Sequence, residues 1–278
     1  PDQIHEIGLQ ALKDINIEMQ AIRQSMGFTG TAAEFHLKLR DDKRLYSSSP
    51  EEVEQRYLAY VGRIETHLPE YFSQQPQTPY GVKRASPVAE TSMTHGYYSG
   101  GAPGGTGYYY YIGSDLDSRS MISAGFLIYH ELAPGHHFHL SLVKENQQLS
   151  DYRRGVSVNA FAEGWANYAS HLAKEIGMLD DPYDHYGWLL SNAYISARLV
   201  LDTGLNHKGW SLEKASRYML ENTFASESEV ATEVLRYSAD IPAQALSYKL
   251  GYAKILDLRE TAEEALGERF DLREFHAA

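Results

Sequence analysis

The chain has 278 residues, and 43% of them are hydrophobic, enough for a large core in one domain or in two closely joined lobes. A formal net charge of −12 argues against nucleic acid as a partner, because that binding neutralises phosphates with Lys and Arg. The absence of cysteine excludes disulfides and cysteine-ligated metals, and no apolar run is long enough to span a membrane.

The chain begins with helical patterns. Apolar residues recur at helical spacing through residues 4–26 and stop at Gly27, which favours a helix that ends there. Helix starts are predicted at Thr31 and at Ser49-Pro50, where a hydroxyl can cap the backbone. A stripe of apolar residues over 53–68 at three- and four-residue steps then predicts a helix that faces the core.

Residues 78–125 break this helical pattern. Residues 99–107 are rich in glycine and predict a loop. Four tyrosines and an isoleucine follow, and they predict a strand over residues 108–112.

The second half of the chain returns to helical patterns. Residues 159–168 predict a helix, and Ser226 opens another that runs through Tyr237. Pro242 can start a long helix that ends near Leu266, just before a glycine. The expected fold class is therefore mainly α with a small β-sheet.

Histidines gather in one short segment. Four of the chain's 12 histidines lie between Ile128 and His139, and Glu131 directly follows His130. On an unbroken helix His130 and His136 would differ by about 600° of rotation and would not share a face. Pro134-Gly135 should break that helix, so that His136 can turn back toward His130.

Zinc held by two histidines takes a further protein ligand, often a carboxylate from another element. The best candidate is Glu163, which lies among aromatic residues in the predicted helix 159–168. We expect His130, His136 and Glu163 to bind Zn²⁺, with Glu131 as the general base that takes the proton of an activated water.

Other histidines near this segment are harder to place. Three roles are open for His137 and for His139. Each side chain can support the metal ligands from behind, contact a substrate, or replace one of the ligands. His171 and Glu175 lie further along the helix that carries Glu163, and we expect them to be surface groups.

The pattern His-Glu-x-x-Pro-Gly-His-His, followed about 25 residues later by Glu-Gly-Trp-Ala-x-Tyr, resembles the DUF885 family. Further segments that resemble this family, in the same order, are Arg198–Leu205, Glu233–Tyr237, Pro242–Gly251 and Phe270–His276. Three positions depart from it: Asn206 replaces a histidine, Ala243 a glycine, and His139 a glutamine. From the alanine we expect a turn at Ala243 that does not need positive φ.

The resemblance implies a gluzincin-like zinc metallopeptidase. It implies a zincin-like helical architecture in which residues 1–278 form a single domain, the C-terminal portion of a longer chain. Residues 1–48 would be a helical N-terminal segment and residues 49–278 the family core. In zincin-type peptidases an edge strand beside the metal helix can pair with an extended peptide. Residues 108–112 resemble that strand, which would make Tyr110 a substrate contact; an ordinary core strand is the alternative.

Further substrate contacts are also implied by the resemblance. Tyr237 is the candidate catalytic hydroxyl for stabilising an oxyanion, and Tyr248 is a second candidate near the substrate. Arg198 and Arg236 are candidate anchors for a substrate carboxylate, although Arg198 can simply pair with Asp202 along a helix.

These features favour a zinc-dependent hydrolase that acts on a peptide or small amide. Two alternatives remain: a helical binding protein without turnover, and a metallohydrolase of small amides or esters. Many family members resemble exported proteins, so we favour a periplasmic or secreted location over the cytoplasm. The sequence does not specify the oligomeric state.

Overall fold

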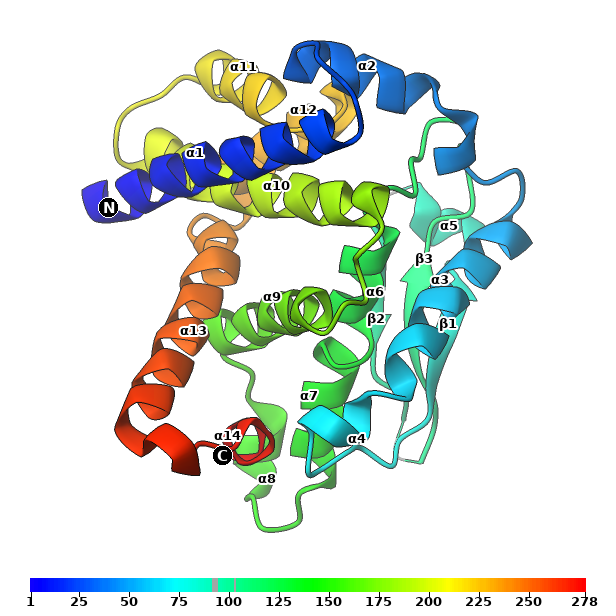
Figure 1. Ribbon diagram of the computed structural model, residues 1–278, viewed down its shortest axis with the longest axis vertical. Helices are drawn as coiled ribbons and strands as arrows, with labels where there is room; N and C mark the ends of the chain where they lie inside the picture. The colour runs from blue at the N-terminus through cyan, green and yellow to red at the C-terminus, as the bar shows by residue number, and fades with distance from the viewer. Residues whose placement is uncertain (92–94, 103) are drawn as a thin grey trace. The chain divides into compact units, whose positions relative to one another are not determined.

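A computed structural model describes residues 1–91, 95–102 and 104–278, and these are mainly helical with one small sheet (Figure 1). This confirms the predicted fold class. Pro103, in the predicted loop 99–107, lies outside the described residues.

The chain divides into two compact units, each built from three segments. Unit 1 comprises Pro1–Ser47, Asp117–Ser123 and Leu179–Lys249. Unit 2 comprises the remaining segments, Ser48–Leu116, Ala124–Met178 and Leu250–Ala278. Unit 1 thus combines the first 47 residues with a long later segment.

In the described residues of unit 1, the regular elements are all helices. Its elements are α1 (Asp2–Ser25), α2 (Ala32–Asp41), η1 (Lys43–Leu45), α10 (Pro182–Asn206), α11 (Leu212–Asn222), α12 (Glu227–Leu235), η2 (Arg236–Asp240) and η3 (Gln244–Leu246). The first of these helices ends as predicted, with Gly27 at φ +75°. Thr31 and Glu34 form the predicted capping box of α2.

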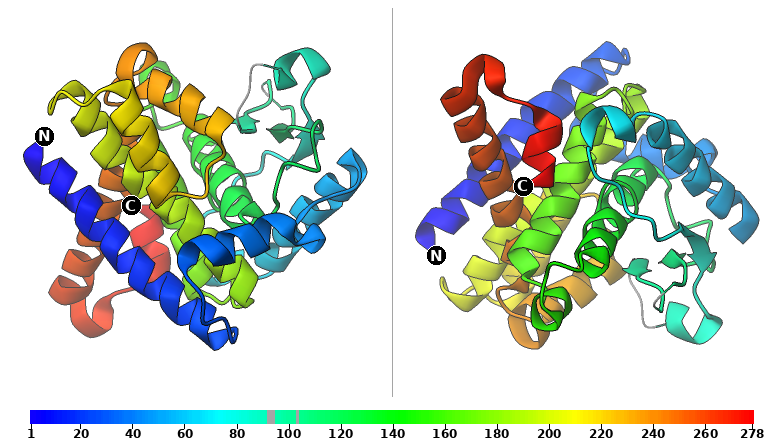
Figure 2. Two further views of the ribbon diagram at one scale, coloured as in Figure 1. Left: turned by 90° about the horizontal axis from the view of Figure 1, so that it is seen from above. Right: turned by 90° about the horizontal axis from the view of Figure 1, so that it is seen from below.

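Helix α1 runs along α10, as seen from above in Figure 2. The two helices meet at Gly8, where an added Cβ would lie 2.8 Å from the Val200 side chain. Nearby, His5 Nδ1 lies 2.8 Å from the Thr203 hydroxyl. Helix α10 is buried along most of its length, which makes it the centre of unit 1.

The predicted helix starts of the last third are partly wrong. Ser226 caps α12 as expected, but this helix ends at Leu235 and η2 follows as a wider turn. The long helix α13 (Ser247–Leu266) starts five residues after Pro242. The helix cannot begin at Pro242 because Ala243 has φ +69°, which no α-helix accommodates, and residues 244–246 form η3 instead. The expectation that this turn does not need positive φ is therefore wrong.

We expect Ala243→Gly to stabilise the fold by about 0.5–1 kcal/mol. A non-glycine residue with positive φ costs roughly 1–2 kcal/mol, and glycine removes this cost. Part of the gain is offset because glycine has more conformational entropy in the unfolded chain and loses it on folding. Urea unfolding measures the change. Ala253→Gly, at an exposed position inside α13, should lose about 1 kcal/mol and serves as the control. Equal losses in both variants would contradict the prediction.

Unit 2 holds the sheet and most of the remaining helices. Its elements are α3 (Pro50–Glu65), α4 (Leu68–Tyr71), β1 (Tyr80–Arg84), α5 (Pro87–Glu90), β2 (Tyr97–Ser99), β3 (Gly107–Tyr111), α6 (Ala124–Glu131), α7 (His136–Glu145), α8 (Asp151–Gly155), α9 (Asn159–Glu175), most of α13, η4 (Gly267–Arg269) and α14 (Leu272–Ala277).

The sheet has the order β1-β3-β2. Strand β3 pairs in parallel with β1 and antiparallel with β2, where Tyr98 lies opposite Tyr109. The predicted strand 108–112 exists, but it is the central strand, so its interpretation as a free edge is wrong. The sequence did not reveal this because the edge strand β2 has only three residues.

Helices α9 and α13 cross at two glycines. A Cβ at Gly164 would lie 2.6 Å from Gly251 Cα, and a Cβ at Gly251 would overlap the Ala160 carbonyl oxygen. The backbones approach so closely that neither position has room for a side chain. This crossing holds α9, which carries Glu163, against α13 (Figure 1).

We expect Gly251→Ala to destabilise the protein by about 2–3 kcal/mol, because the added methyl group overlaps backbone atoms that cannot move without separating the helices. Gly62→Ala is the matched control. It lies in α3 with no atom near an added Cβ, so it should gain up to about 1 kcal/mol from helix propensity alone. Denaturant midpoints measure both, and a neutral Gly251→Ala would contradict the close crossing.

Candidate metal centre

Three side chains of unit 2 converge on one point. His136 Nε2 lies 3.2 Å and His130 Nε2 lies 3.5 Å from the same oxygen, Oε2 of Glu163. The two imidazole rings are 4.7 Å apart and nearly perpendicular. Among the described residues, this is the cluster of histidine and carboxylate ligands whose atoms lie close enough to share one ion. The sequence-based expectation that these three residues meet is confirmed.

The loop between α6 and α7 produces the convergence. The first helix ends at Glu131 and the second begins at His136, so the helix breaks where Pro134-Gly135 predicts. Gly135 is required for this close turn because a Cβ there would overlap the His130 carbonyl oxygen. The indole of Trp165 donates a 2.9 Å hydrogen bond to the Pro134 carbonyl, which fixes the loop against α9.

Helix α9 contributes two residues, one turn apart, to this centre. Glu163 faces the Nε2 atom of His130, and Asn167 Oδ1 lies 2.9 Å from its Nδ1. With Nδ1 donating its proton to the amide, Nε2 keeps a lone pair directed at the cluster. The sequence analysis missed Asn167; its position four residues after Glu163 was the available signal, because such residues share a helix face.

We expect Asn167→Ala to weaken zinc binding by about 10- to 100-fold, because the His130 ring loses the acceptor that sets its tautomer. Asn167→Asp should preserve binding, since a carboxylate accepts the same bond. Asn159→Ala, at the exposed start of α9, is the matched control. Competition with a chelating dye measures the affinity, and equal values for the two alanine variants would contradict the role of Asn167.

Glu131 is buried beside this cluster. Its Oε2 accepts a 3.0 Å hydrogen bond from the backbone N–H of Tyr98 on β2. Burial raises the pKa of Glu131, while the charges of His136 and His130 and the Tyr98 N–H oppose that rise. The carboxylate is therefore a stronger base than a solvated glutamate.

Charges within the cluster favour an ionised ligand set. Burial opposes ionisation of Glu163, but the two imidazoles outweigh it and hold the pKa of this carboxyl well below its usual range. Burial also opposes protonation of His136, yet Glu163 and Glu131 raise its pKa above the ordinary value. A divalent cation would replace the proton that these carboxylates attract to His136.

The other two histidines of the motif point elsewhere. His137 is fully buried, and its Nδ1 lies 2.9 Å from the Tyr98 hydroxyl. His139 packs edge-on against Phe161, with ring centroids 5.0 Å apart. Burial lowers the pKa of each to about 4, so both rings are neutral near pH 7. Neither joins the ligand cluster formed by the described residues.

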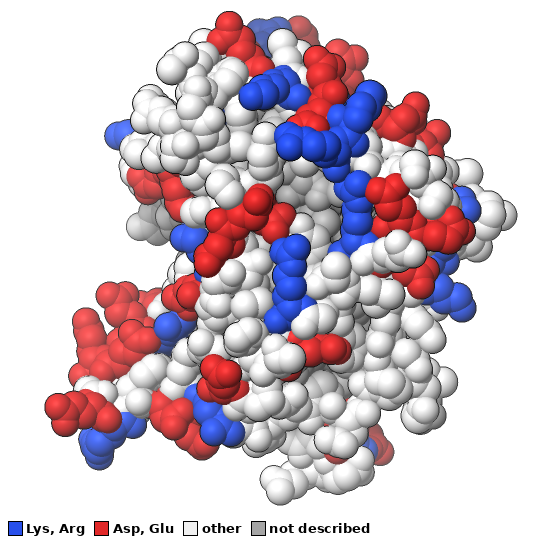
Figure 3. All heavy atoms as spheres, turned by 45° about the vertical axis from the view of Figure 1, so that its right-hand side comes forward, with Lys and Arg blue, Asp and Glu red and all other residues white. Residues whose placement is uncertain are grey.

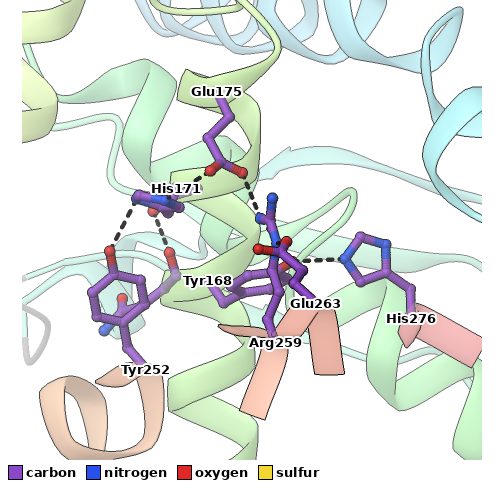
Figure 4. A network of polar contacts seen from close by, with 9 residues as sticks. Tyr168, His171, Glu175, Tyr252, Arg259, Glu263 and His276 are labelled. Atoms are coloured by element: carbon purple, nitrogen blue, oxygen red, sulfur yellow. Dashed lines mark hydrogen bonds and ion pairs between the residues drawn. The ribbon is translucent and has the colours of Figure 1, made fainter. Parts of the chain in front are cut away.

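His171 and Glu175 lie outside the metal cluster, as expected, but they take part in a network of polar contacts. Figure 4 shows them in a network that joins α9 to α13 and α14. Glu175 lies 3.4 Å from His171 Nε2 and accepts a 2.7 Å bond from Arg259, while the Tyr252 hydroxyl lies 2.9 Å from His171 Nδ1. Burial opposes ionisation of Glu175, but these two partners lower its pKa to about 2. The network stabilises the same helix contact as the glycine crossing.

Four further predicted residues lie in unit 1, where they gather around Glu233. Arg198 donates to the Tyr237 hydroxyl at 2.8 Å and to Glu233 at 3.1 Å. Tyr237 and Arg236 also donate to this carboxylate, and the Tyr248 ring lies 4.6 Å from the Arg198 guanidinium carbon.

Glu233, which has no exposed surface, is the centre of this cluster, and the sequence analysis did not identify it. The expected pairing of Arg198 with Asp202 is absent from the hydrogen bonds of the described residues. Asp202 instead accepts a 2.7 Å bond from the Ala243 backbone. Tyr110, in β3 of unit 2, stacks on Tyr97 with ring centroids 5.3 Å apart.

Charged side chains of both signs share the molecular surface (Figure 3). On the face shown in Figure 3, Lys and Arg side chains lie between Asp and Glu side chains and form no continuous basic surface among the described residues. Within the described ranges, none of the helices is long and apolar enough to cross a membrane.

Comparison with known proteins places this site in a family and a fold. The model of the family described as "Bacterial protein of unknown function (DUF885)" matches residues 1–278. Curated proteins gave no match.

Two solved structures are similar to the chain. One is described as "the putative lipoprotein from Colwellia psychrerythraea"; it is 37% identical, with a TM-score of 0.94, over 99% of this chain and 48% of that chain. The other, "a putative lipoprotein of unknown function from Shewanella oneidensis", is 21% identical, with a TM-score of 0.82, over 99% of this chain and 53% of that one. The chain thus spans about half the length of these two proteins.

Proposed function

The chain belongs to the DUF885 family, whose description assigns no activity, and we propose from its candidate metal centre that it is a zinc-dependent hydrolase that cleaves peptide bonds. The observation that carries this proposal is the convergence of His130, His136 and Glu163, with the buried carboxylate of Glu131 beside them.

The residues fit a zinc ion. Two imidazole nitrogens and one carboxylate oxygen are a common ligand set of catalytic zinc, and they leave a position for water or substrate. Glu163 Oε2 is buried, and in the described part of the chain no donor meets it with hydrogen-bond geometry, as expected for an oxygen that serves a cation. A bound zinc would supply Lewis acidity, which lowers the pKa of a water toward ~7 and polarises a carbonyl.

Glu131 is the proposed general base. Its carboxylate takes the proton from the attacking water and passes it to the nitrogen of the leaving amine. The Tyr98 N–H binds one carboxylate oxygen, Oε2, so the proposal assigns the proton to the other oxygen. Asn167 fixes the His130 ring during this transfer through its bond to Nδ1.

The edge strand β2 is the proposed place for an extended substrate. It is an outer strand of the sheet, and its backbone contacts Glu131 directly. A peptide that paired with this strand would pass close to the base. Catalysis by Tyr237 and substrate contacts by Arg198, Arg236, Tyr248 and Tyr110 remain proposals that rest on the family resemblance.

Export is a further part of the proposal. Both similar structures are described as lipoproteins, a class of exported protein, and this supports a location outside the cytoplasm for this chain as well.

Metal analysis and a substrate screen test the proposed function. Protein purified from zinc-replete medium should contain about one zinc per chain and should hydrolyse members of a peptide library; small amides and esters are screened beside the peptides. Activity on esters alone would show that the substrates are esters and not peptides. Protein without bound metal under replete conditions would overturn the proposal.

A further inference from the structure

The adjacent histidines at the start of α7 face different neighbours. His136 points at Glu163, whereas His137 is fully buried against the sheet, because successive side chains on a helix are rotated by about 100°. Helix α7 and strand β2 lie side by side (Figure 1), so His137 reaches Tyr98 while its neighbour reaches the metal cluster.

Tyr98 connects His137 to the proposed base. Its hydroxyl lies 2.9 Å from His137 Nδ1, and its backbone N–H donates to Glu131 at 3.0 Å. Ser141, one turn further along α7, lies 3.4 Å from the same Nδ1 and belongs to the same helix face. Both ends of Tyr98 are therefore held, the side chain by α7 and the backbone by α6.

The contact between Tyr98 and His137 is closely packed. A Cβ at Gly107 would overlap the Tyr98 hydroxyl and would lie 3.0 Å from His137 Nδ1. The Tyr80 ring covers the other side of the imidazole, with centroids 4.5 Å apart. Strand β2 has only three residues, so this side-chain anchor adds to a short backbone ladder in fixing where the Tyr98 N–H points.

We propose that His137 is a positioning residue that acts through Tyr98 to hold the Glu131 carboxylate in place for proton transfer. The catalytic meaning of this role rests on the proposed hydrolase function, but the positioning itself does not. Two neighbouring histidines thus perform separate tasks, since one helps to form the metal cluster and the other orients the base.

Amide hydrogen exchange at Tyr98 tests the positioning without any substrate. In the wild-type protein this N–H should be protected by its bond to Glu131. Tyr98→Phe removes only the hydroxyl, and His137→Leu removes the ring nitrogens; each should speed exchange of this amide by about tenfold or more. His137→Asn should restore protection, because its amide carries an acceptor and a donor as far from Cα as Nδ1 is. Protection in α9 reports whether the fold is retained.

Kinetics test the consequence for catalysis. With the best substrate from the screen, Tyr98→Phe and His137→Leu should lower kcat by about 10- to 100-fold, with KM and zinc content unchanged, and His137→Asn should recover most of the loss. Tyr152→Phe, on the exposed surface of α8, is the control and should match the wild type.

The two proposals can fail separately. Unchanged exchange at Tyr98 in both Tyr98→Phe and His137→Leu would overturn the positioning role, whatever the activity. If the two variants lose protection of the Tyr98 amide but the wild-type protein hydrolyses no substrate, the positioning role stands. Only the hydrolase function is then contradicted.

Discussion

Replacing Glu131 by Gln is expected to lower kcat by about 10²- to 10⁴-fold, the usual contribution of a general base. Glutamine has nearly the same shape, and its amide oxygen can still accept the Tyr98 N–H, so the fold should be retained. It has no basic oxygen, however, and cannot take a proton from water. Steady-state hydrolysis of the best peptide substrate measures the loss, and metal analysis should show zinc at the wild-type content.

Glu264→Gln is the control for this substitution. Glu264 lies at an exposed position of α13, so the same chemical change there should leave kcat, zinc content and stability unchanged. Full activity of Glu131→Gln would show that this carboxylate is not the base, even if zinc is bound.

Replacing His136 by Ala is expected to weaken zinc binding by at least about 100-fold, because one of three protein ligands is lost and the Glu163 oxygen keeps only one imidazole partner. Zinc stabilises a folded protein that binds it better than the unfolded chain does. Added zinc should therefore raise the Tm of the wild-type protein but not that of the variant. Metal analysis after dialysis should show zinc well below one per chain.

His139→Ala provides the matched control, since His139 lies in the same helix but outside the cluster. It should keep its zinc and its zinc-dependent rise in Tm, despite losing the contact with Phe161. If both variants retain zinc equally, the ion is bound elsewhere or by a different set of ligands.

Most of the candidate metal site was predictable because its residues lie close together in the sequence. His130, Glu131 and His136 lie within seven residues, and the helix break between them follows from a proline and a glycine. Glu163 was predictable as a candidate by its surroundings and by the family resemblance. The break itself lies where Pro134 and Gly135 predict it, between two separate helices that carry the histidines.

The edge strand shows where sequence reasoning failed. The tyrosine run at 108–111 has strong β propensity, and the sequence places it correctly in a strand. Whether a strand is central or at an edge depends on its partners, and here both partners are remote in sequence or very short. Glu131, the proposed base, therefore contacts Tyr98 of β2, a residue that no local pattern identified.

Ala243 is a similar case. Substitution of a glycine by alanine suggested ordinary backbone geometry, yet the turn keeps a positive φ because Asp202 and the start of α13 hold it. Side-chain identity is a weak guide to φ where tertiary contacts impose the backbone conformation.

The sequence by itself determined the mainly helical class, several helix starts and the histidines that can bind a metal, because these depend on neighbours a few positions apart. The tertiary structure alone decided that Glu163 and Asn167 share one imidazole, that the second histidine of the pair faces Tyr98, and that Arg198 and Tyr237 meet at Glu233. These contacts join residues that lie about 30 to 40 positions apart. They form only when helices and strands pack, and the packing of α9 depends on two glycines that leave room for no side chain.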